Sequence, residues 1–390
     1  MRVNERDVKQ TGLILGIESS CDETAAAVVR AGGDALSNIV ASQMNLHANY
    51  GGVVPELASR EHLRNVVPVV RAAMKQAQVS FDDLDAIAVT EGPGLAGALL
   101  VGITYAKALS FGLGKPLIGV NHLEGHIHAV LMEARQSGAA SMELPLLALV
   151  VSGGHTHLYL ANVGEEGAWS YRNVGRTVDD AAGEAYDKVA KLLGLGYPGG
   201  PWIDSLAKKG NPDAVAFRFS RIKPRGHREG GPADEVRFDF SFSGIKTAVL
   251  RYIETHGMRE HVEARRRELA QHPEWGPRSE EAALLCDSET LNLIASFQHA
   301  VVGNLLRQTF AAAETFGARG IVVSGGVAAN SELRRRFQAE ADRRGLPIAF
   351  PSVALSTDNA AMIAAAAWPK FVTGKFAPDT LGATPQLRLG

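Results

Sequence analysis

The stretch Leu13–Val29, LILGIESSCDETAAAVV, contains two apolar runs separated by a turn of small, hydroxyl-bearing and acidic residues. Two short apolar runs around such a turn are typical of a β-hairpin. The stretch Leu147–Val163, LALVVSGGHTHLYLANV, is arranged in the same way. We therefore expect one hairpin early in each half of the chain.

A second pattern follows each predicted hairpin further along the chain. Leu84–Leu109 contains a buried strand, a glycine turn and a helix of alternating small and large apolar residues, and Ala318–Ala341 repeats that order. Two copies of a hairpin followed by strand, turn and helix predict a duplicated α/β domain. The polar stretch Gln136–Glu143 is the expected boundary between the copies.

The composition is that of a globular protein. With 390 residues and 46% hydrophobic content, the chain can form two or three domains with a core in each. The first ten residues are charged where a signal peptide would be apolar, and the longest apolar runs are shorter than the ~18 residues of a membrane span. The two cysteines, Cys21 and Cys286, are too few for a disulfide framework or a thiolate metal site. We expect a cytoplasmic protein without a membrane segment.

The net charge of −2 gives the molecule as a whole no field that would attract nucleic acid. Such a partner would have to bind local basic segments, although each of these is also explained as an ordinary solvated face. The stretch Glu254–Glu289, dense in Glu and Arg, is predicted to be a solvated helix or a surface insertion. The basic segments are Arg218–Arg228, Arg265–Arg267, Arg334–Arg336 and Arg343–Arg344.

The predicted turns carry small hydrogen-bonding residues at the ends of apolar strands, where α/β folds gather their ligands. Glycine lets a backbone approach a phosphate closely, and free N–H groups at a helix start favour anions. Together the turns predict a nucleotide cleft between the two copies, whereas any one of them is equally explained by the needs of a tight turn. The residues are Ser19, Ser20, Asp22, Thr24, Ser152, Gly153, Gly154, Thr156, Ser324, Gly325, Gly326 and Asn330.

Two common nucleotide motifs are disfavoured or absent. Gly92–Gly97, GPGLAG, matches the GxGxxG pattern of dinucleotide-binding proteins. Such a site also needs an acidic residue at the end of the next strand, roughly 20 residues on. The chain has Pro116 and the strand LIGVNH there instead. No GxxxxGK[ST] sequence occurs, which excludes a P-loop ATPase.

The stretch Asn121–His128, NHLEGHIH, is rich in histidine. On a helix, His122 and His126 lie on one face, a spacing that suits two imidazoles on one metal ion. A zinc protease of the HExxH type is excluded, because Leu123 follows the first histidine and Glu124 lies about 200° around the helix from it. Two packed, hydrogen-bonded histidines in an apolar helix remain an alternative to a metal pair.

Asp358, in the sequence LSTDNAAMIAAAAW, is the best candidate for a third ligand. The competing interpretation is that it caps the apolar helix that follows. Ser356, Thr357, Asp358 and Asn359 are all residue types that cap helix starts, and a carboxylate is favoured there by the helix dipole. The sequence leaves both roles open.

Nine motifs occur together in the order seen in the tRNA N6-adenosine threonylcarbamoyltransferase family, the TsaD family of bacteria, formerly described as O-sialoglycoprotein endopeptidase. The chain resembles this family from about Leu13 to Trp368. It departs from the family pattern at Glu254–Glu289, which is longer than the usual connection, and in about ten additional residues before the first strand. The motifs are IESSCDETAAAVV, GGVVPELASREH, GPGLAGALLVG, NHLEGHIHA, LVVSGGHT, DDAAGEAYDKVAKLLGLGYPGGPWID, FSFSGIKTAV, SGGVAAN and TDNAAMIA.

The resemblance implies an actin-like or sugar-kinase-like (ASKHA) α/β fold of two duplicated ribonuclease-H-like lobes with a nucleotide cleft between them. The N-terminal lobe would be residues 1–140, completed by a C-terminal helix at about 356–390, and the C-terminal lobe would be residues 141–355 with an insertion at about 254–289. The implied reaction transfers a threonylcarbamoyl group from threonylcarbamoyl-adenylate to N6 of adenosine 37, just 3′ to the anticodon, in tRNAs that read ANN codons. It forms t6A and releases AMP.

The resemblance also implies the site residues. His122, His126 and Asp358 would hold one divalent metal ion, Fe²⁺ first and Zn²⁺ as the alternative, with coordination positions left open for the donor. Asp187 suits a ribose hydroxyl or an adenine amine, unless it only pairs with Lys188 or Lys191; Asp204 suits the same groups, unless it only caps a helix. The residues implied in adenylate binding are Val150, Val151, Ser152, Gly153, Gly154, Asp187, Gly200, Asp204 and Asn330.

The exocyclic amine of adenosine is a poor nucleophile, so some group must accept its proton. Asp22 or Glu23 in the first hairpin turn is the expected acceptor. The alternative is that these two carboxylates order the loop or the outer shell of the metal.

The family implies four partners: tRNA, the adenylate, a paralogous non-catalytic subunit (TsaB-like) and a small ATPase (TsaE-like). A helix such as Val101–Leu109, with Gly and Ala on one side, would pack either on the paralogue or inside this chain. The competing function is an ATP-dependent phosphotransferase or ATPase of the same fold class. Magnesium prefers oxygen ligands, so such an enzyme would not need the histidine pair.

Overall fold

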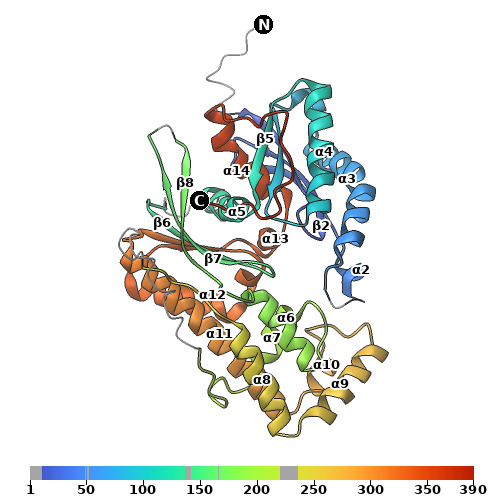
Figure 1. Cartoon of the computed structure of the whole chain (residues 1–390), viewed down its shortest axis with the longest axis vertical. Helices are drawn as coiled ribbons and strands as arrows, with labels where there is room; N and C mark the ends of the chain where they lie inside the picture. The colour runs from blue at the N-terminus through green and yellow to red at the C-terminus, as the bar shows by residue number, and fades with distance from the viewer. Residues whose placement is uncertain (1–10, 49, 51, 137–141, 166, 220–235) are drawn as a thin grey trace, which may run out of the picture.

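The computed structural model describes residues 11–48, 50, 52–136, 142–165, 167–219 and 236–390. They form two lobes, each built on one five-stranded sheet, which lie one above the other in Figure 1. The first sheet contains β1 (Leu13–Glu18), β2 (Glu23–Arg30), β3 (Asp34–Ser42), β4 (Ala86–Gly92) and β5 (Leu117–Asn121), in the order β3-β2-β1-β4-β5. The second contains β6 (Leu146–Val151), β7 (Thr156–Val163), β8 (Trp169–Arg176), β9 (Gly320–Ser324) and β10 (Ile348–Ala349), in the order β8-β7-β6-β9-β10.

The two sheets have the same topology. β1 pairs antiparallel with β2 and parallel with β4, and β6 makes the same two pairings with β7 and β9. Both predicted hairpins are therefore confirmed, and so is the duplication of the α/β unit. The sequence pattern does not predict β3 and β8, which extend each hairpin on its outer side. Most of the predicted boundary, residues 137–141, lies outside the described residues.

Helices cover the outer faces of the sheets. α3 (Pro55–Ala77) and α4 (Ala96–Leu113) pack on the first sheet. α6 (Ala182–Leu192) and α11 (Ser288–Thr315) pack on the second. Further helical segments are α2 (Met44–Ala48), η1 (Phe81–Asp83), α7 (Gly199–Ala207), η2 (Gly326–Ala329), α12 (Ser331–Arg344) and α13 (Val353–Ser356).

α5 (His122–Gln136) lies between the two sheets and belongs to the core of both lobes (Figure 1). Ala129 and Met132 pack with the first sheet, whereas Ile127 and Val130 pack with the second. A helix enclosed on both sides cannot shift without disturbing two cores. The histidines at its N-terminal end therefore have a fixed position between the lobes.

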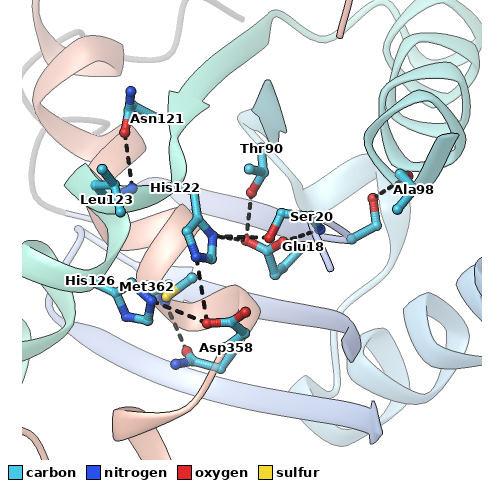
Figure 2. Close-up of polar contacts among 12 residues, drawn as sticks. Glu18, Ser20, Thr90, Ala98, Asn121, His122, Leu123, His126, Asp358 and Met362 are labelled. Carbon is cyan, nitrogen blue, oxygen red and sulfur yellow. Dashed lines mark hydrogen bonds and ion pairs between the residues drawn. The ribbon is translucent and has the colours of Figure 1, made fainter. Parts of the chain in front are cut away.

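α14 (Ala360–Val372) packs on the first sheet beside α5. Its small side chains allow the helix to approach β1 closely, and a Cβ on Gly16 would lie 2.4 Å from the backbone oxygen of Ala360. This crossing brings the residues just before α14, including Asp358, to the end of β1 (Figure 2). The lobe bounds 1–140 with 356–390, and 141–355, stay a prediction, which this packing of α14 supports.

The insertion predicted at Glu254–Glu289 is helical. It contains the end of α8 (Ser243–Thr255), then α9 (Arg259–Gln271) and α10 (Glu280–Leu284), at the far end of the second lobe in Figure 1. The prediction of a solvated helix or surface insertion is confirmed, because most residues of α9 are exposed. A few apolar residues anchor the insertion. Val262, Ala282 and Cys286 are buried in the core of the second lobe, because the helices fold back onto α6 and α11.

Three of the predicted basic segments have roles in the fold. Arg265 is 1% exposed and donates to two backbone oxygens inside the second lobe. Arg334 donates to the backbone oxygens of two different segments, and Arg343 and Arg344 pair with a glutamate of their own helix. Arg265 and Arg334 are thus excluded as free contacts to a nucleic acid. Most of Arg218–Arg228 lies outside the described residues.

α4 is long and apolar enough, by length and composition alone, to cross a membrane, with a hydropathy of 1.4 over 18 residues. The core helix of a globular protein passes the same test, and α4 packs on the first sheet through Leu99 and Ile103. Gly102 and Ala106 are buried, so the small-residue side that was a candidate partner surface packs inside this chain. The exposed apolar residues are Leu100 and Phe111.

Candidate metal and nucleotide site

Two histidines lie in the first two turns of α5, which begins directly after β5. The side-chain oxygen of Asn121 accepts a hydrogen bond from the N–H of Leu123 at 2.9 Å, which satisfies one of the free donors at the helix start. The rings of His122 and His126 lie 4.8 Å apart at an angle of 80°. Both side chains are buried and point toward Asp358 (Figure 2).

Asp358 is free to complete this group because a neighbour caps the helix. The side chain of Asn359 accepts from the N–H of Met362 at 3.0 Å and is the N-cap of α14. The competing interpretation of Asp358 as the cap is therefore wrong. Its Oδ1 lies 3.1 Å from His126 Nε2 and 3.6 Å from His122 Nε2.

The three side chains fit a metal ion. Their ligand atoms lie within 4.8 Å of one another, and ligands on a tetrahedral ion at about 2.1 Å are roughly 3.4 Å apart. His126 Nε2 approaches Asp358 but makes no well-aligned hydrogen bond, and its Nδ1 has no partner among the described residues. A buried imidazole with no hydrogen bond calls for an explanation, and coordination through Nε2 would provide one.

Glu18, at the end of β1, forms the outer shell of this group. Its Oε2 lies 3.1 Å from His122 Nδ1 and accepts from the hydroxyl of Thr90 at 2.7 Å (Figure 2). A bond at Nδ1 orients the ring so that Nε2 is the ligand atom. Burial disfavours the charged imidazole, but Asp358 and Glu18 outweigh burial and raise the pKa of His122 to about 9. Two carboxylates that favour a proton here would also favour a divalent cation in its place.

The other polar residues of α5 point away from this group. Glu124 pairs with Lys370 of α14 at 2.9 Å, which confirms that it cannot share the site. His128 Nε2 lies 2.9 Å from the hydroxyl of Tyr171 on β8. Burial lowers the pKa of His128 to about 3, so the third histidine is a neutral residue that joins α5 to the second sheet.

The turn between β1 and β2 is held by a histidine of α3. His62 Nδ1 lies 2.8 Å from Thr24 Oγ1, and its Nε2 lies 3.0 Å from the backbone oxygen of Cys21. Burial and the adjacent Asp22 raise the pKa of Glu23 to about 9. Burial and Asp22 therefore favour the protonated form of Glu23. Which of the two residues accepts the proton of the substrate stays a prediction.

The equivalent turn of the second sheet, between β6 and β7, presents backbone instead. The N–H of Ser152 donates to the backbone oxygen of His155 at 2.8 Å and closes the turn. Gly153 and Gly154 are exposed, and a Cβ on either would meet no atom within 4 Å. A Cβ on Gly183 would lie 2.6 Å from the backbone oxygen of Ser152, so the start of α6 packs against the turn from behind.

The ends of β6 and β9 lie side by side in the second sheet. Val150 and Val151 are fully buried, so only their backbone can face a ligand. Ser324 lies opposite Val150 in the parallel pairing, and its buried hydroxyl has no hydrogen-bond partner among the described residues. A buried hydroxyl in this position favours a polar ligand.

Asp187 and Gly200 lie on the neighbouring helices α6 and α7. The N–H of Gly199 donates to Asp187 Oδ1 at 2.7 Å, while Lys188 pairs with two other carboxylates. The alternative pairing of Asp187 with Lys188 is therefore not formed. Burial raises the pKa of Asp187 to about 6. A Cβ on Gly200 would meet no atom within 4 Å, so the space beside it is open.

Asp204 and Asn330 have partners within the fold. Asp204 Oδ1 accepts from the N–H and the hydroxyl of Ser331, the first residue of α12, at 3.1 and 2.8 Å, whereas the N-cap of α12 is Asn330. Asn330 accepts from the N–H of Leu333 and donates to Gln298. Their contribution to a ligand site stays a prediction.

The sequence analysis does not single out two further residues, His155 and Tyr197. The ring of His155 lies 6.1 Å from that of His122, and burial followed by His122 lowers its pKa to about 3. Burial, then Asp187 and Asp22, raise the pKa of Tyr197 to about 12. Both residues lie in turn sequences, next to Gly or Pro, that predict backbone geometry rather than side-chain contacts.

Relatives of the chain share its full length. The sequence profile of the family described as tRNA N6-adenosine threonylcarbamoyltransferase matches residues 34–365. A protein of that name from Koribacter versatilis (strain Ellin345) is 62% identical over 382 residues, which cover 97% of this chain and 99% of the relative. Another from Symbiobacterium thermophilum is 49% identical over 380 residues and 97% of each chain.

Solved structures share the fold. Full-length HypF in a phosphate- and nucleotide-bound form has a TM-score of 0.52 at 12% identity, over 93% of this chain and 46% of that one. HypF of T. kodakarensis has a TM-score of 0.51 at 14% identity, over 95% and 49%. At this identity the likeness concerns the fold alone, and it confirms the actin-like, sugar-kinase-like architecture.

Proposed function

The chain belongs to the tRNA N6-adenosine threonylcarbamoyltransferase family, and we propose that it carries out this transfer in the cleft between β1, β6 and α5. The reaction moves the threonylcarbamoyl group of threonylcarbamoyl-adenylate to N6 of adenosine 37, forming t6A and releasing AMP. The observation that supports this location best is the meeting of His122, His126 and Asp358, which come from distant parts of the chain.

The proposed metal group suits the chemistry of the donor. Threonylcarbamoyl-adenylate is a mixed anhydride of a carbamic and a phosphoric acid, so its reactive points are the carbonyl carbon and the leaving phosphate. A divalent ion held by His122, His126 and Asp358 would supply Lewis-acid stabilisation of the charge that develops there. Glu18 keeps the ring of His122 oriented for that role. We propose Fe²⁺, with Zn²⁺ as the alternative, because imidazole and carboxylate ligands suit both.

We propose that the adenylate lies along the turn after β6. The N–H groups of Gly153 and Gly154 have no acceptor among the described residues, and no side chain blocks them. Such donors can bind phosphate oxygens or a developing oxyanion. The open space at Gly200 and the second oxygen of Asp187 suit the ribose. Val150 and Val151 would contact the adenylate through backbone groups. Asp204 and Asn330 would contact it only through side-chain atoms that are not already hydrogen-bonded within the fold.

We propose Asp22 as the group that accepts the proton of the adenosine amine. A proton acceptor must be ionised, whereas Glu23, with a pKa of about 9, is protonated at neutral pH. The two carboxyls share a hydrogen bond in the first hairpin turn. In this arrangement Glu23 holds the side chain of Asp22 in place. Glu23 then has an ordering role, which the alternative interpretation gives to both Asp22 and Glu23.

The enzyme acts on tRNA, and we propose that a paralogous TsaB-like subunit binds the outer face of α3 and α4. Leu63, Leu100 and Phe111 on these helices are 65%, 56% and 92% exposed. Exposed large apolar side chains on neighbouring helices support an interaction site there. A small TsaE-like ATPase completes the proposed assembly, which would work in the cytoplasm, where tRNA is modified.

The experiment that tests the function is the formation of modified adenosine. The chain is incubated with its two partner proteins, tRNA, threonine, bicarbonate, ATP and the enzyme that makes the adenylate, and nucleosides are analysed by mass spectrometry. Loss of t6A on chelation and recovery with Fe²⁺ or Zn²⁺ added separately identifies the metal. ATP hydrolysis by the chain alone, combined with no t6A from the complete mixture, would favour the phosphotransferase or ATPase alternative, for which the comparisons give no evidence.

A further inference from the structure

A groove opens beside the proposed metal site, between β7 and β8 of the second sheet and the segment 385–390. Its volume is ≈ 480 Å³, within the range that holds a small organic ligand. His155 lines the groove, and its ring lies 6.1 Å from that of the metal-site residue His122. Leu123, the neighbour of His122, lines it as well. The groove is therefore within reach of a group attached to the reacting nucleotide.

Three rings at the start of β7 form one wall of the groove. His155, His157 and Tyr159 occupy alternate positions, so they face the same side of the sheet. Their ring centroids are 5.8 and 5.6 Å apart, and the rings of His157 and Tyr159 are parallel to within 7°. Rings arranged in this way offer a stacking platform to an unstacked RNA base.

A β-bulge brings polar side chains to the same wall. The pairing of β7 with β8 shifts at Leu158/Tyr159, so that Asn173 lies opposite Tyr159 while Arg176 lies opposite His157. In a regular strand, two residues three positions apart would face opposite sides of the sheet. The bulge instead places Asn173 and Arg176 together in the groove, and bulges are often found where a side chain must be redirected toward a site.

The contacts within the groove define the proton position of His157. Its Nδ1 lies 3.2 Å from the amide nitrogen of Asn173 and 3.3 Å from the hydroxyl of Tyr159, and both of these groups donate. The ring proton is then on Nε2. Burial, followed by Arg176, lowers the pKa of His157 to about 4, which keeps the ring neutral. Among the described residues the Nε2–H has no acceptor, so it is a donor available to a ligand.

The charge of the groove suits a nucleotide. Arg176 and Arg388 line it and have no carboxylate partner among the described residues, whereas Arg237 is held by Asp239 and Asn173. No Asp or Glu side chain lines the groove in the described part of the chain. Cations next to stacked rings match the phosphate and base of a single-stranded nucleic acid.

We propose that this groove binds the uridine that precedes the target adenosine, an inference that rests on the proposed transferase function. tRNAs that read ANN codons have uridine as the third anticodon nucleotide, directly 5′ of the modified adenosine. Its base stacks on the rings of β7, its O4 accepts a hydrogen bond from His157 Nε2, and Arg176 contacts its phosphate. Cytidine has an amino donor in place of O4, and two facing donors repel. The groove therefore reads the nucleotide that defines the ANN class.

The test compares two anticodon stem-loops, one with uridine and one with cytidine before the target adenosine, using the complete enzyme assembly. The wild-type chain prefers uridine. His157→Leu lowers kcat/KM for the uridine substrate by ~10-fold and brings the two substrates to within about threefold, because one base-specific hydrogen bond is lost. His157→Gln, which keeps an N–H donor, recovers part of the preference. A uridine-to-cytidine ratio that is unchanged in His157→Leu overturns the proposal.

Two arginines of β8 provide a matched control. Arg172 lies on the same strand as Arg176, but its guanidinium lies 4.7 Å above the ring of Phe316, away from the groove. Arg176→Ala lowers the affinity for both stem-loops by the same factor and reduces the salt dependence of binding, whereas Arg172→Ala leaves both affinities unchanged. Equal effects of the two substitutions would contradict the assignment of the phosphate contact.

A separate readout distinguishes the groove from the catalytic site. His157→Leu is expected to retain the wild-type metal content and the wild-type affinity for a non-hydrolysable adenylate analogue. If the wild-type chain forms t6A and His157→Leu keeps the full preference for uridine, only the groove is wrongly assigned. If the wild-type assembly modifies neither stem-loop, the proposed function and this inference fail together.

Discussion

The turn between β1 and β2 and the turn between β6 and β7 occupy equivalent places in two sheets of the same strand order, yet they are built differently. In the first, side chains make the contacts: His62 holds the turn and Glu18 contacts His122. In the second, Gly153 and Gly154 leave the backbone exposed. One position in a duplicated scaffold therefore suits a cation in one lobe and an anion in the other.

The difference follows from what each kind of ion requires. A transition metal needs nitrogen and oxygen ligands held at defined angles, and these angles are kept by an outer shell of hydrogen bonds. A phosphate or an oxyanion needs N–H donors, which every turn provides when no side chain covers them. The acidic and histidine side chains around the first turn match the needs of a metal ion. The glycines of the second turn match those of a phosphate or an oxyanion.

The largest expected effect is on the metal side of this comparison. His126→Ala removes one of the three proposed ligands, and kcat/KM should fall by at least ~10³-fold, because a metal ion contributes several kcal/mol of transition-state stabilisation. His128→Gln, in the same helix, should keep metal and activity and lose only stability, by roughly 1 kcal/mol, through its bond to Tyr171. Metal content per chain and t6A formation are the measurements. A full metal complement in His126→Ala would refute the ligand set.

The next effect contrasts two glycines of the second lobe. Gly154→Val places a side chain in open space, so thermal unfolding should be unchanged while the affinity for an adenylate analogue falls by roughly 10- to 100-fold, equivalent to one to three kcal/mol of lost contacts. Gly325→Ala should instead lower the stability, because its φ is +90° and a Cβ would lie 2.4 Å from the backbone oxygen of Val151. The expected loss of stability is about 1–3 kcal/mol.

Calorimetric titration and unfolding of the two glycine variants separate the roles. If Gly154→Val bound the analogue as tightly as the wild-type chain, the turn after β6 would not be the adenylate site. If both variants lost stability equally, the space beside Gly154 would not be open to a side chain.

A smaller effect is expected in the outer shell. Glu18→Gln exchanges an acceptor for an N–H donor that faces the hydroxyl of Thr90 and the ring of His122. Metal affinity should fall by roughly 10- to 100-fold, the usual size for an outer-shell change, and excess metal should restore activity. Titration of the metal-free variant measures this. Activity that excess metal cannot restore would mean that Glu18 acts on the substrate and not on the ligand.

The strands that the sequence predicted correctly are those with a clear local pattern of apolar residues. The hairpins at Leu13–Val29 and Leu147–Val163 have apolar runs on both sides of a turn, and the structure confirms them. β3, at Asp34–Ser42, is an edge strand with only one buried residue, so it has little alternation to detect. The same holds in part for β8, whose first half is exposed or half-exposed.

Site residues depended more on tertiary contacts. The sequence left Asp358 open between cap and ligand, and only the bond from Met362 to Asn359 decides against the cap. Nothing local predicts that Glu18 faces His122, since the two are joined by the pairing of β1 with β4 and of β4 with β5. Helical spacing was sufficient only for His122 and His126, which lie on one element.

The smallest expected effect concerns pH at the anion side of the comparison. Burial raises the pKa of Asp187 to about 6, so its carboxylate is ionised above that pH and accepts a ribose hydroxyl best there. Affinity for the adenylate analogue should be full at pH 7 to 8 and should fall several-fold as the pH drops through 6. Asp187→Asn, which can still accept from the N–H of Gly199, should bind several-fold more weakly than the wild-type chain at pH 8 and should not vary across this range. If titrations between pH 5 and 8 give the same midpoint in the wild-type chain and in Asp187→Asn, a different group titrates, and Asp187 serves only to hold the start of α7.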